Sequence, residues 1–338
     1  MKTQVLTQIR SMEMQEQDTP VIQKADDVLL QVDMVGVCGS DMHYYRNGNI
    51  GAQVMEFPFA LGHECVATVL DAGDAVSLRP GDRVAVDPAV SCRQCDQCLS
   101  GREHTCRNLV FMGCPGQLPG CLSEYYVMPE RSLYQVADTV SDEDAALVEP
   151  LSVAAYTIQQ ASLSSGDKIA ILGAGPIGLA VALAAIAEGH AIELISDLLD
   201  YRLEVAKTLS THALKANELD TFFGQFDVVI ECCGQQSALD EGCRLLAPGG
   251  KLLIVGIVED MRISFMPDIL RRQELSIINI RRQNNCMLQA ISLLTNDSID
   301  LAILKTHVFD FSQSREAFDL VDNYADGVIK AFIRVGEQ

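Results

Sequence analysis

The pattern of hydrophobic and polar residues changes character near residue 150. Before that point, short hydrophobic runs are separated by polar turn signals such as Asp71-Ala-Gly-Asp and Arg79-Pro-Gly-Asp. The clearest of these strand-like runs are Asp27–Val35, Glu64–Leu70 and Arg83–Asp87. We therefore predict an irregular, mostly-β unit over residues 1–150, with loops that can carry chemistry.

From Lys168 onward, strand-like and helix-like segments alternate. Such alternation is typical of parallel strands joined by crossover helices. The predicted strands are Lys168–Leu172, Ala191–Ser196, Asp227–Glu231 and Lys251–Gly256. One predicted helix follows the first strand and ends at Ala187, and a second spans Ser237–Leu246. After Arg281 the pattern predicts helices over Cys286–Leu294 and Ser312–Leu320 and a strand over Val328–Val335, which on pattern alone fit either domain.

Length and composition agree with a two-domain globular protein. The chain has 338 residues, of which 48% are hydrophobic and 21% charged. No apolar run reaches the roughly 20 residues that span a membrane, and the N-terminus lacks the apolar core of a signal peptide. We expect a cytoplasmic protein that binds no membrane. A net charge of −21 also argues against nucleic acid as a partner, since phosphates would be repelled.

A glycine-rich turn follows the first predicted strand of the alternating region. Gly173, Gly175 and Gly178 form the spacing Gly-x-Gly-x-x-Gly, with Pro176 and Ile177 between them. The glycines permit a tight turn, close approach of a pyrophosphate and close packing of helix on strand. Because this turn lies between a strand and a helix, whose N-terminus attracts phosphate, we predict a dinucleotide site.

Two residues beyond the turn bear on the choice of dinucleotide. Asp197 ends the next predicted strand, where its carboxylate can bind both ribose hydroxyls and would repel a 2′-phosphate. This favours NAD over NADP. Arg202 lies one turn into the following helix, where it either covers the adenosine or simply pairs with a carboxylate.

Four cysteines lie close together in a chain that otherwise scatters them. Without an export signal, the 12 cysteines do not indicate a disulfide framework. Four thiolates at short spacing are typical of a closed, structural zinc site; a redox pair fits less well, and an iron–sulfur cluster is chemically possible. These residues are Cys92, Cys95, Cys98 and Cys106.

A second, dispersed set offers the ligand types of a catalytic zinc ion. Cys38, the pair His63-Glu64, and Glu149 supply a thiol, an imidazole and two carboxylates. Spacing alone leaves other interpretations open. A buried cysteine is usually a small hydrophobic residue, His63 can be a core histidine, and either carboxylate can lie on a solvated turn.

Taken in order, the motifs resemble the zinc-containing medium-chain dehydrogenase/reductase family over essentially the whole chain. Within it, Cys-Gly-Ser-Asp-x-His-Tyr-Tyr and Glu-Pro-Leu resemble the polyol (sorbitol or L-iditol) dehydrogenase branch. The motifs are Val37-Cys-Gly-Ser-Asp-Met-His43, Gly62-His-Glu64, the four cysteines, Glu149-Pro-Leu151 and Gly173-Ala-Gly-Pro-Ile-Gly178. The resemblance implies an α/β fold: a GroES-like, mostly-β catalytic domain (1–150 and 281–338) and a Rossmann, doubly wound NAD-binding domain (151–280).

The resemblance also implies a role for each residue of the dispersed set. Cys38, His63 and Glu64 would bind the catalytic zinc, and Glu149 would either complete the shell or hold its water. Ser40 and His43 would pass the alcohol proton to solvent; alternatively, Ser40 caps a turn and His43 packs beside it. Tyr44, Glu149 and Arg281 would contact a small polyhydroxylated substrate, and a homodimer or homotetramer is expected. The implied reaction is NAD-linked, zinc-dependent hydride transfer.

The sequence departs from the polyol branch at two places. Arg282 replaces an aromatic residue, which either extends the substrate range to carboxylated sugars or places a guanidinium on the acidic surface. Cys114 lies where the branch commonly carries Thr-Pro-Pro, and we interpret it as a packing residue. Cys232 and Cys233, after a predicted strand, are interpreted as structural.

Other functions remain as alternatives. A sugar-acid, L-threonine or glucose dehydrogenase would use the same zinc and a different pocket. The full ligand set argues against a zinc-free enone or quinone reductase. Outside the enzymes, a structural or binding protein recruited from this fold would not need the intact ligands, and the net charge opposes a zinc-finger nucleic-acid binder.

Overall fold

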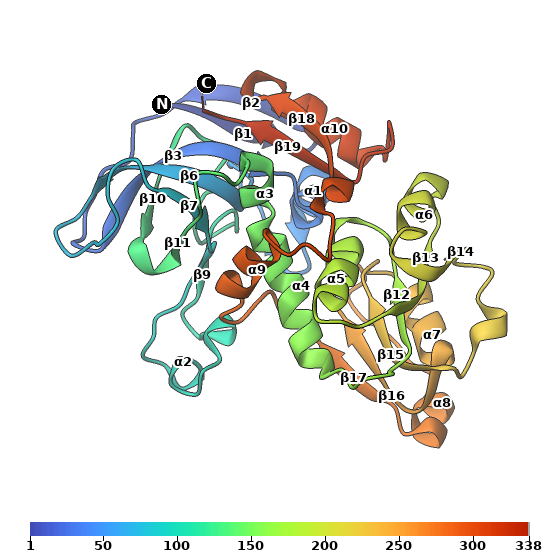
Figure 1. Cartoon of the computed structure of the whole chain (residues 1–338). Coiled ribbons are helices and arrows are strands. Elements are labelled where there is room, and N and C mark those ends of the chain that lie inside the picture. The colour runs from blue at the N-terminus through green and yellow to red at the C-terminus, as the bar shows by residue number, and fades with distance from the viewer. Residues whose placement is uncertain (337–338) are drawn as a thin grey trace. The chain divides into compact units, whose positions relative to one another are not determined.

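The computed structural model describes residues 1–336, which form two compact units. The first comprises residues 1–149 and 305–336, and the second Pro150–Leu304. The chain therefore leaves the first unit, completes the second and returns (Figure 1).

A seven-stranded sheet forms the centre of the first unit. Along β3 the residues Val28, Leu30 and Val32 are buried and alternate with half-buried neighbours, so one face of the strand packs into the core. All pairs are antiparallel except β18 with β19. The strand order is β11 (Leu133–Gln135), β7 (Arg83–Val86), β6 (Glu64–Ala72), β3 (Asp27–Gly36), β19 (Lys330–Arg334) and β18 (Lys305–Asp310), with β10 (Tyr125–Pro129) on β3.

Short elements surround this sheet. The hairpin of β1 (Lys2–Gln8) and β2 (Ser11–Glu16) lies near α10 (Ser314–Asp322), whose Phe318 ring packs 5.3 Å from that of Tyr45. The other elements are α1 (Gly39–Asn47), β4 (Asn49–Ile50), β5 (Gln53–Val54), β8 (Ala89–Val90), α2 (Asp96–Leu99), η1 (Glu103–Thr105), β9 (Val110–Phe111), η2 (Glu130–Ser132), α3 (Asp142–Ala146) and η5 (Phe311–Gln313).

The second unit contains a six-stranded parallel sheet. The chain starts at the centre, moves outward through two strands, and then returns to fill the other side. This is the doubly wound order, in which ligands bind at the carboxyl ends of the strands where the direction reverses. The order is β14 (Ser210–Lys215), β13 (Ile192–Asp197), β12 (Ile169–Leu172), β15 (Phe226–Glu231), β16 (Leu246–Ile254) and β17 (Ser276–Asn279).

Helices connect these strands, as Figure 1 shows. The helix α5 (Pro176–Ala187) is made largely of alanine and aliphatic residues and is almost entirely buried, which explains why it lacks a polar face. The remaining helices are α4 (Val148–Ala161), which begins two residues before the unit boundary, α6 (Asp200–Ala206), η3 (Asp220–Phe222), α7 (Gln236–Leu245), α8 (Pro267–Gln273), α9 (Met287–Leu293) and η4 (Leu301–Leu304).

The predicted fold class is confirmed, and most predicted elements end within a few residues of the observed ones. The largest difference concerns the return of the chain. The sequence prediction placed the return to the first domain at residue 281, whereas the chain rejoins the first unit at Lys305. The segment before it, which contains α9, stays with the second unit because Cys286 packs against Ala155 and Tyr156 of α4.

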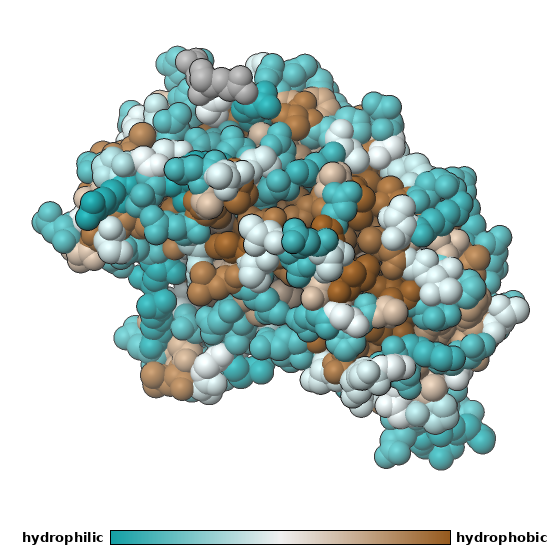
Figure 2. Space-filling view, in the orientation of Figure 1, coloured by the Kyte–Doolittle hydropathy of each residue, from teal (hydrophilic) through white to brown (hydrophobic). Residues whose placement is uncertain are grey.

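On the face shown in Figure 2, hydrophilic residues cover much of the surface, with apolar residues between them. Within residues 1–336, every helix is too short or too polar to cross a membrane.

Candidate active site and metal centres

Pairing of β3 with β6 brings the dispersed ligand set together. Gly36 at the end of β3 lies opposite Glu64 at the start of β6. Cys38 follows two residues after Gly36, and His63 immediately precedes Glu64. As a result, one donor atom each from Cys38, His63 and Glu64 lies within 4.8 Å of the others. A thiol, an imidazole and a carboxylate at this separation fit a zinc ion that keeps further positions for water or substrate.

The helix α1 supplies groups that orient these ligands. Asp41 Oδ1 lies 3.3 Å from His63 Nδ1, and both side chains are buried. A carboxylate beside Nδ1 favours the tautomer in which Nδ1 carries the proton and Nε2 is free to bind a metal. Ser40 Oγ lies 3.3 Å from Cys38 Sγ and 3.4 Å from His63 Nε2. His43 is half-buried one helical turn after Ser40.

Glu64, the third candidate ligand, forms a buried ion pair with Lys330. Lys330 Nζ donates to Glu64 Oε2, and both side chains are only 2% exposed. Lys330 lies on β19, which pairs with the other edge of β3. Gly36 is required between them, because a Cβ there would lie 2.5 Å from Glu64 Oε2 and 3.0 Å from Lys330 Cε. The pair fixes one oxygen of Glu64.

The electrostatics of this cluster suit a cation. Burial lowers the pKa of His63, but Asp41 and Cys38 outweigh it and the pKa lies well above its ordinary value. Burial, assisted by Glu64, raises the pKa of Cys38. These groups therefore retain protons when no cation is bound, and a metal that binds here must displace them.

Glu149 occupies the first turn of α4 and is buried. It is not among the three residues whose donor atoms lie within 4.8 Å of one another. Its surroundings still couple it to them: burial raises the pKa of Glu149 to about 7, His63 lowers it and Glu64 raises it. Of the two predicted carboxylates, Glu64 is therefore the one that the fold places with Cys38 and His63.

The predicted substrate residues lie in both units. Tyr44 on α1 is buried, and its hydroxyl donates to Gln53 Oε1 at 3.2 Å. Arg281 and Arg282 follow β17 in the second unit. Arg282 has a φ of 54°, in the left-handed region that few residues other than glycine adopt.

The four-cysteine lobe forms a second donor cluster. One sulfur from each of Cys92, Cys95, Cys98 and Cys106 lies within 4.8 Å of the others. Hydrogen bonds, chiefly from the Gln94 backbone, lower the pKa of Cys92 to about 6, whereas burial and neighbouring thiols raise that of Cys98 to about 12. Four thiols this close cannot all ionise without a cation. Four sulfurs and no open position fit a structural zinc ion.

The glycine-rich turn lies between β12 and α5, as predicted. Gly173 has a φ of 103°, and a Cβ on Gly178 would lie 1.8 Å from the Gly173 carbonyl oxygen. Pro176 and Ile177 begin α5, with proline at a position where its missing N–H costs nothing. Gly175 is the N-cap, and a Cβ there would lie 3.4 Å from the guanidinium of Arg202.

Asp197 ends β13 beside this turn. Its carboxylate accepts hydrogen bonds from the backbone N–H of Ala174 at 2.8 Å and of Leu199 at 2.9 Å. Arg202 Nη1 lies 3.6 Å from Asp197 Oδ2. The carboxylate is therefore fixed at the carboxyl edge of the parallel sheet, where a doubly wound fold binds its ligand.

Replacing Gly178 by alanine should abolish dinucleotide binding, because the new methyl group would overlap the Gly173 carbonyl and force the turn open. Gly39→Ala is the matched control: a Cβ there meets no atom within 4 Å. NADH binding, followed by nucleotide fluorescence, should be lost in the first variant and kept in the second. Equal binding by both would contradict this role of the turn.

Glu231, a residue that the sequence interpretation missed, lies at the carboxyl end of β15. Its Oε1 accepts from the backbone N–H groups of Cys233 and Gly234, both at 2.6 Å. A Cβ on Gly173 would lie 2.8 Å from Cys233 Sγ, so the cysteine pair packs against the glycine-rich turn. Burial raises the pKa of Cys232, which keeps its thiol protonated. A carboxylate directly after the apolar run Val228–Ile230 was the signal for Glu231.

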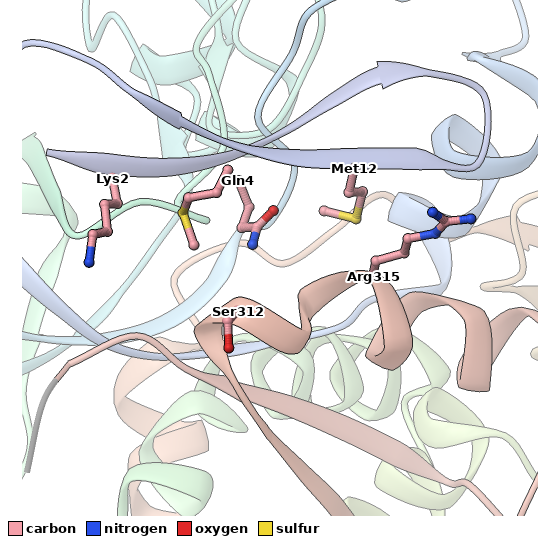
Figure 3. A pocket seen from close by; sticks show the side chains of 6 residues that line it. Lys2, Gln4, Met12, Ser312 and Arg315 are labelled. Atoms are coloured by element: carbon pink, nitrogen blue, oxygen red, sulfur yellow. The ribbon is translucent and has the colours of Figure 1, made fainter.

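The first unit also has a hollow of about 300 Å³ between the β1–β2 hairpin and the start of α10 (Figure 3). Its lining residues within the described range 1–336 include no cysteine, histidine or carboxylate. It therefore lacks metal ligands and is not part of the candidate active site. Its lining residues are Lys2, Gln4, Met12, Met14, Ser312 and Arg315.

Comparison with known proteins gives matches over both units. Residues 24–138 match the alcohol dehydrogenase GroES-like domain, and residues 176–296 match the zinc-binding dehydrogenase model. Sorbitol dehydrogenase of Bacillus subtilis is 34% identical, over 98% of this chain and 97% of its own. D-xylulose reductase of Scheffersomyces stipitis is also 34% identical, over 97% of each chain. Among solved structures, L-idonate 5-dehydrogenase of Escherichia coli has a TM-score of 0.91 at 25% identity, covering 98% of this chain and 97% of that one.

The chain belongs to the zinc-containing medium-chain dehydrogenase/reductase family. The resemblance drawn from the motifs is thereby confirmed, and this medium-chain dehydrogenase is an oxidoreductase. Asp41 and Lys330 are residues that the sequence interpretation missed. Asp41 lies inside the Val37–His43 motif, in which the sequence interpretation gave roles only to Cys38, Ser40 and His43. The signal for Lys330 was a lysine next to the apolar residues of the C-terminal strand.

Proposed function

We propose that this medium-chain dehydrogenase transfers a hydride between a polyol, or another sugar-derived secondary alcohol, and NAD in a zinc-dependent reaction. The observation that carries the proposal is the convergence of Cys38, His63 and Glu64 within 4.8 Å. In the described part of the chain, this is the donor cluster that mixes sulfur, nitrogen and oxygen and so retains positions for a substrate.

In this proposal Cys38, His63 and Glu64 hold the catalytic zinc, with Glu149 beside them. When bound, the zinc ion lowers the pKa of the alcohol hydroxyl that contacts it. Asp41 keeps His63 in the metal-binding tautomer, and Lys330 balances the charge of Glu64. Ser40, within hydrogen-bond reach of Cys38 and His63, accepts the alcohol proton and passes it toward His43. Cys92, Cys95, Cys98 and Cys106 hold the structural zinc.

The second unit provides the cofactor site. Gly173, Gly175 and Gly178 let the pyrophosphate approach the N-terminus of α5. Asp197 selects NAD, because its carboxylate can accept from both ribose hydroxyls and repels a 2′-phosphate. Arg202, which already lies beside Asp197 and Gly175, covers the adenosine. NAD supplies the hydride acceptor when it is bound.

Polyols are the proposed substrates because the relatives named above act on sorbitol and D-xylulose. A sugar acid is the second candidate, since Arg282 adds a cation beside Arg281 and a related structure is an L-idonate 5-dehydrogenase. A homodimer or homotetramer and a cytoplasmic location remain predictions.

Metal analysis combined with an NAD-reduction screen tests the proposal. We expect about two zinc ions per chain, and reduction of NAD in the presence of polyols that exceeds the rates with aldonates and amino alcohols. Incubation with a chelator should remove activity, and added zinc should restore it. One zinc ion or none, or activity that survives complete zinc removal, would overturn the site assignments.

A further inference from the structure

Gln53 joins Tyr44 to a third segment of the first unit. The Tyr44 hydroxyl donates to Gln53 Oε1 at 3.2 Å. Gln53 Nε2 donates to the Pro115 carbonyl oxygen at 3.2 Å and also to Cys114 Sγ. The three segments are α1, the short hairpin that contains β5, and the loop after β9. Gln53 is half-buried, whereas Tyr44 and Cys114 are both only 4% exposed.

We infer that Gln53 is a positioning residue for substrate specificity, which makes Tyr44 a hydrogen-bond acceptor for a substrate hydroxyl. This inference rests on the proposed function and refines its substrate class to alcohols that carry further neutral hydroxyl groups. Gln53 does not contact the reacting atoms in this scheme, and it acts through Tyr44.

The hydrogen bonds of Gln53 determine which side of its amide is the oxygen and which is the NH₂ group. A backbone carbonyl oxygen can only accept hydrogen bonds, so the side of Gln53 that faces Pro115 must be its NH₂ group. The opposite side, which faces Tyr44, is then the carbonyl oxygen, and this oxygen can only accept. The phenol must therefore donate its single proton to Gln53.

Because the Tyr44 proton is donated to Gln53, the hydroxyl of Tyr44 can act only as an acceptor toward a ligand. A phenol that has donated its proton meets another group only through its oxygen lone pairs. Such an oxygen attracts an O–H group and repels a carboxylate or carbonyl oxygen. A site of this kind favours neutral polyols over sugar acids at the carbon that Tyr44 contacts, since a buried polar group left unmatched costs binding energy.

Both ends of this network adjoin the candidate metal site. Tyr44 lies on α1, whose N-cap is Cys38. At the other end, Gly113 precedes Cys114, and a Cβ on Gly113 would lie 3.6 Å from His63 Nδ1. The ring of His63 also packs 5.5 Å from that of Phe111, three residues before Cys114. The network therefore links segments that touch two of the three proposed zinc ligands.

Steady-state kinetics of three variants test the inference. Gln53→Met removes the acceptor for the Tyr44 proton and is expected to raise KM for a polyol such as xylitol about tenfold, the scale of one lost hydrogen bond. kcat and KM for NAD should stay within twofold, because the contact is equally strong before and during hydride transfer. Gln53→Glu keeps an acceptor for the Tyr44 proton but turns an oxygen toward the Pro115 carbonyl, so its KM should lie between those of the wild type and Gln53→Met. Tyr44→Phe should raise KM as Gln53→Met does.

The double variant Tyr44→Phe with Gln53→Met should be no worse than Tyr44→Phe alone, because both changes remove one contact. Gln225→Met is the matched control: it removes a glutamine hydrogen bond to the Thr221 carbonyl in the second unit and should leave KM unchanged. Additive losses in the double variant, or a fall in kcat at constant KM, would overturn the role of Gln53 alone. A wild-type enzyme that oxidises no polyol would overturn the proposed function and this inference with it.

Discussion

Replacing Lys330 by methionine should lower the free energy of unfolding by about 3–5 kcal/mol, the usual cost of removing one partner from a buried ion pair. Lys330 and Glu64 are each 2% exposed, so water cannot replace the lost ammonium group. Methionine fills a similar volume, which confines the effect to the charge. Urea denaturation of the metal-free protein, followed by far-UV circular dichroism, measures the change.

Two further variants separate this effect from a general loss of packing. The double variant Lys330→Met with Glu64→Gln removes both charges and should recover most of the lost stability. Lys207→Met is the surface control: it breaks an exposed pair with Glu204 and should cost no more than about 1 kcal/mol. If Lys330→Met were no more destabilising than Lys207→Met, the buried pair would not contribute to folding.

Replacing Asp41 by asparagine should weaken zinc binding at the Cys38 site by about 10- to 100-fold, as is typical when a carboxylate behind a histidine ligand is lost. Asparagine keeps the size of the side chain but not its charge, so the tautomer of His63 that binds the metal is less strongly favoured. Competition with a chelator, read out as zinc retained per chain, measures the affinity.

The four-cysteine lobe is an internal control in this experiment, because its donors form a cluster separate from that of Cys38, His63 and Glu64, and its zinc should be retained. Asp33→Asn controls for loss of a carboxylate elsewhere in the first unit: Asp33 on β3 accepts from Thr68 Oγ1 at 2.7 Å, and its replacement should not affect zinc. Retention of two zinc ions by Asp41→Asn at every chelator concentration that spares the wild type would rule out the proposed role of Asp41.

The sequence predicts best those parts of the site whose residues lie close together along the chain. The turn at Gly173–Gly178 and the four cysteines are short motifs whose chemistry follows from spacing, and the structure brings both together as expected. Cys38 and His63 are further apart, and the sequence alone left their roles open. Their convergence depends on the register of β3 with β6, which hydrophobic alternation does not specify to one residue.

Lys330 and Gln53 could not be predicted in the same way. Lys330 lies 266 residues from Glu64 and meets it only because β19 pairs with β3. The orientation of the Gln53 amide depends on its hydrogen bond to Pro115, which lies in a loop with no regular secondary structure. The unit boundary is a similar case: the pattern after residue 281 fitted either domain, and the packing of Cys286 on α4 decides it.

The position of β19 has a consequence for the order of events during synthesis. The ribosome completes Cys38, His63, Glu64 and the whole parallel-sheet unit before it reaches Lys330. Until then, the Met34–Gly36 end of β3 lacks its partner strand on one side and Glu64 lacks its counter-charge. The second unit can therefore fold while the first is still incomplete, and the proposed zinc ligands reach their finished geometry only after β19 has been translated.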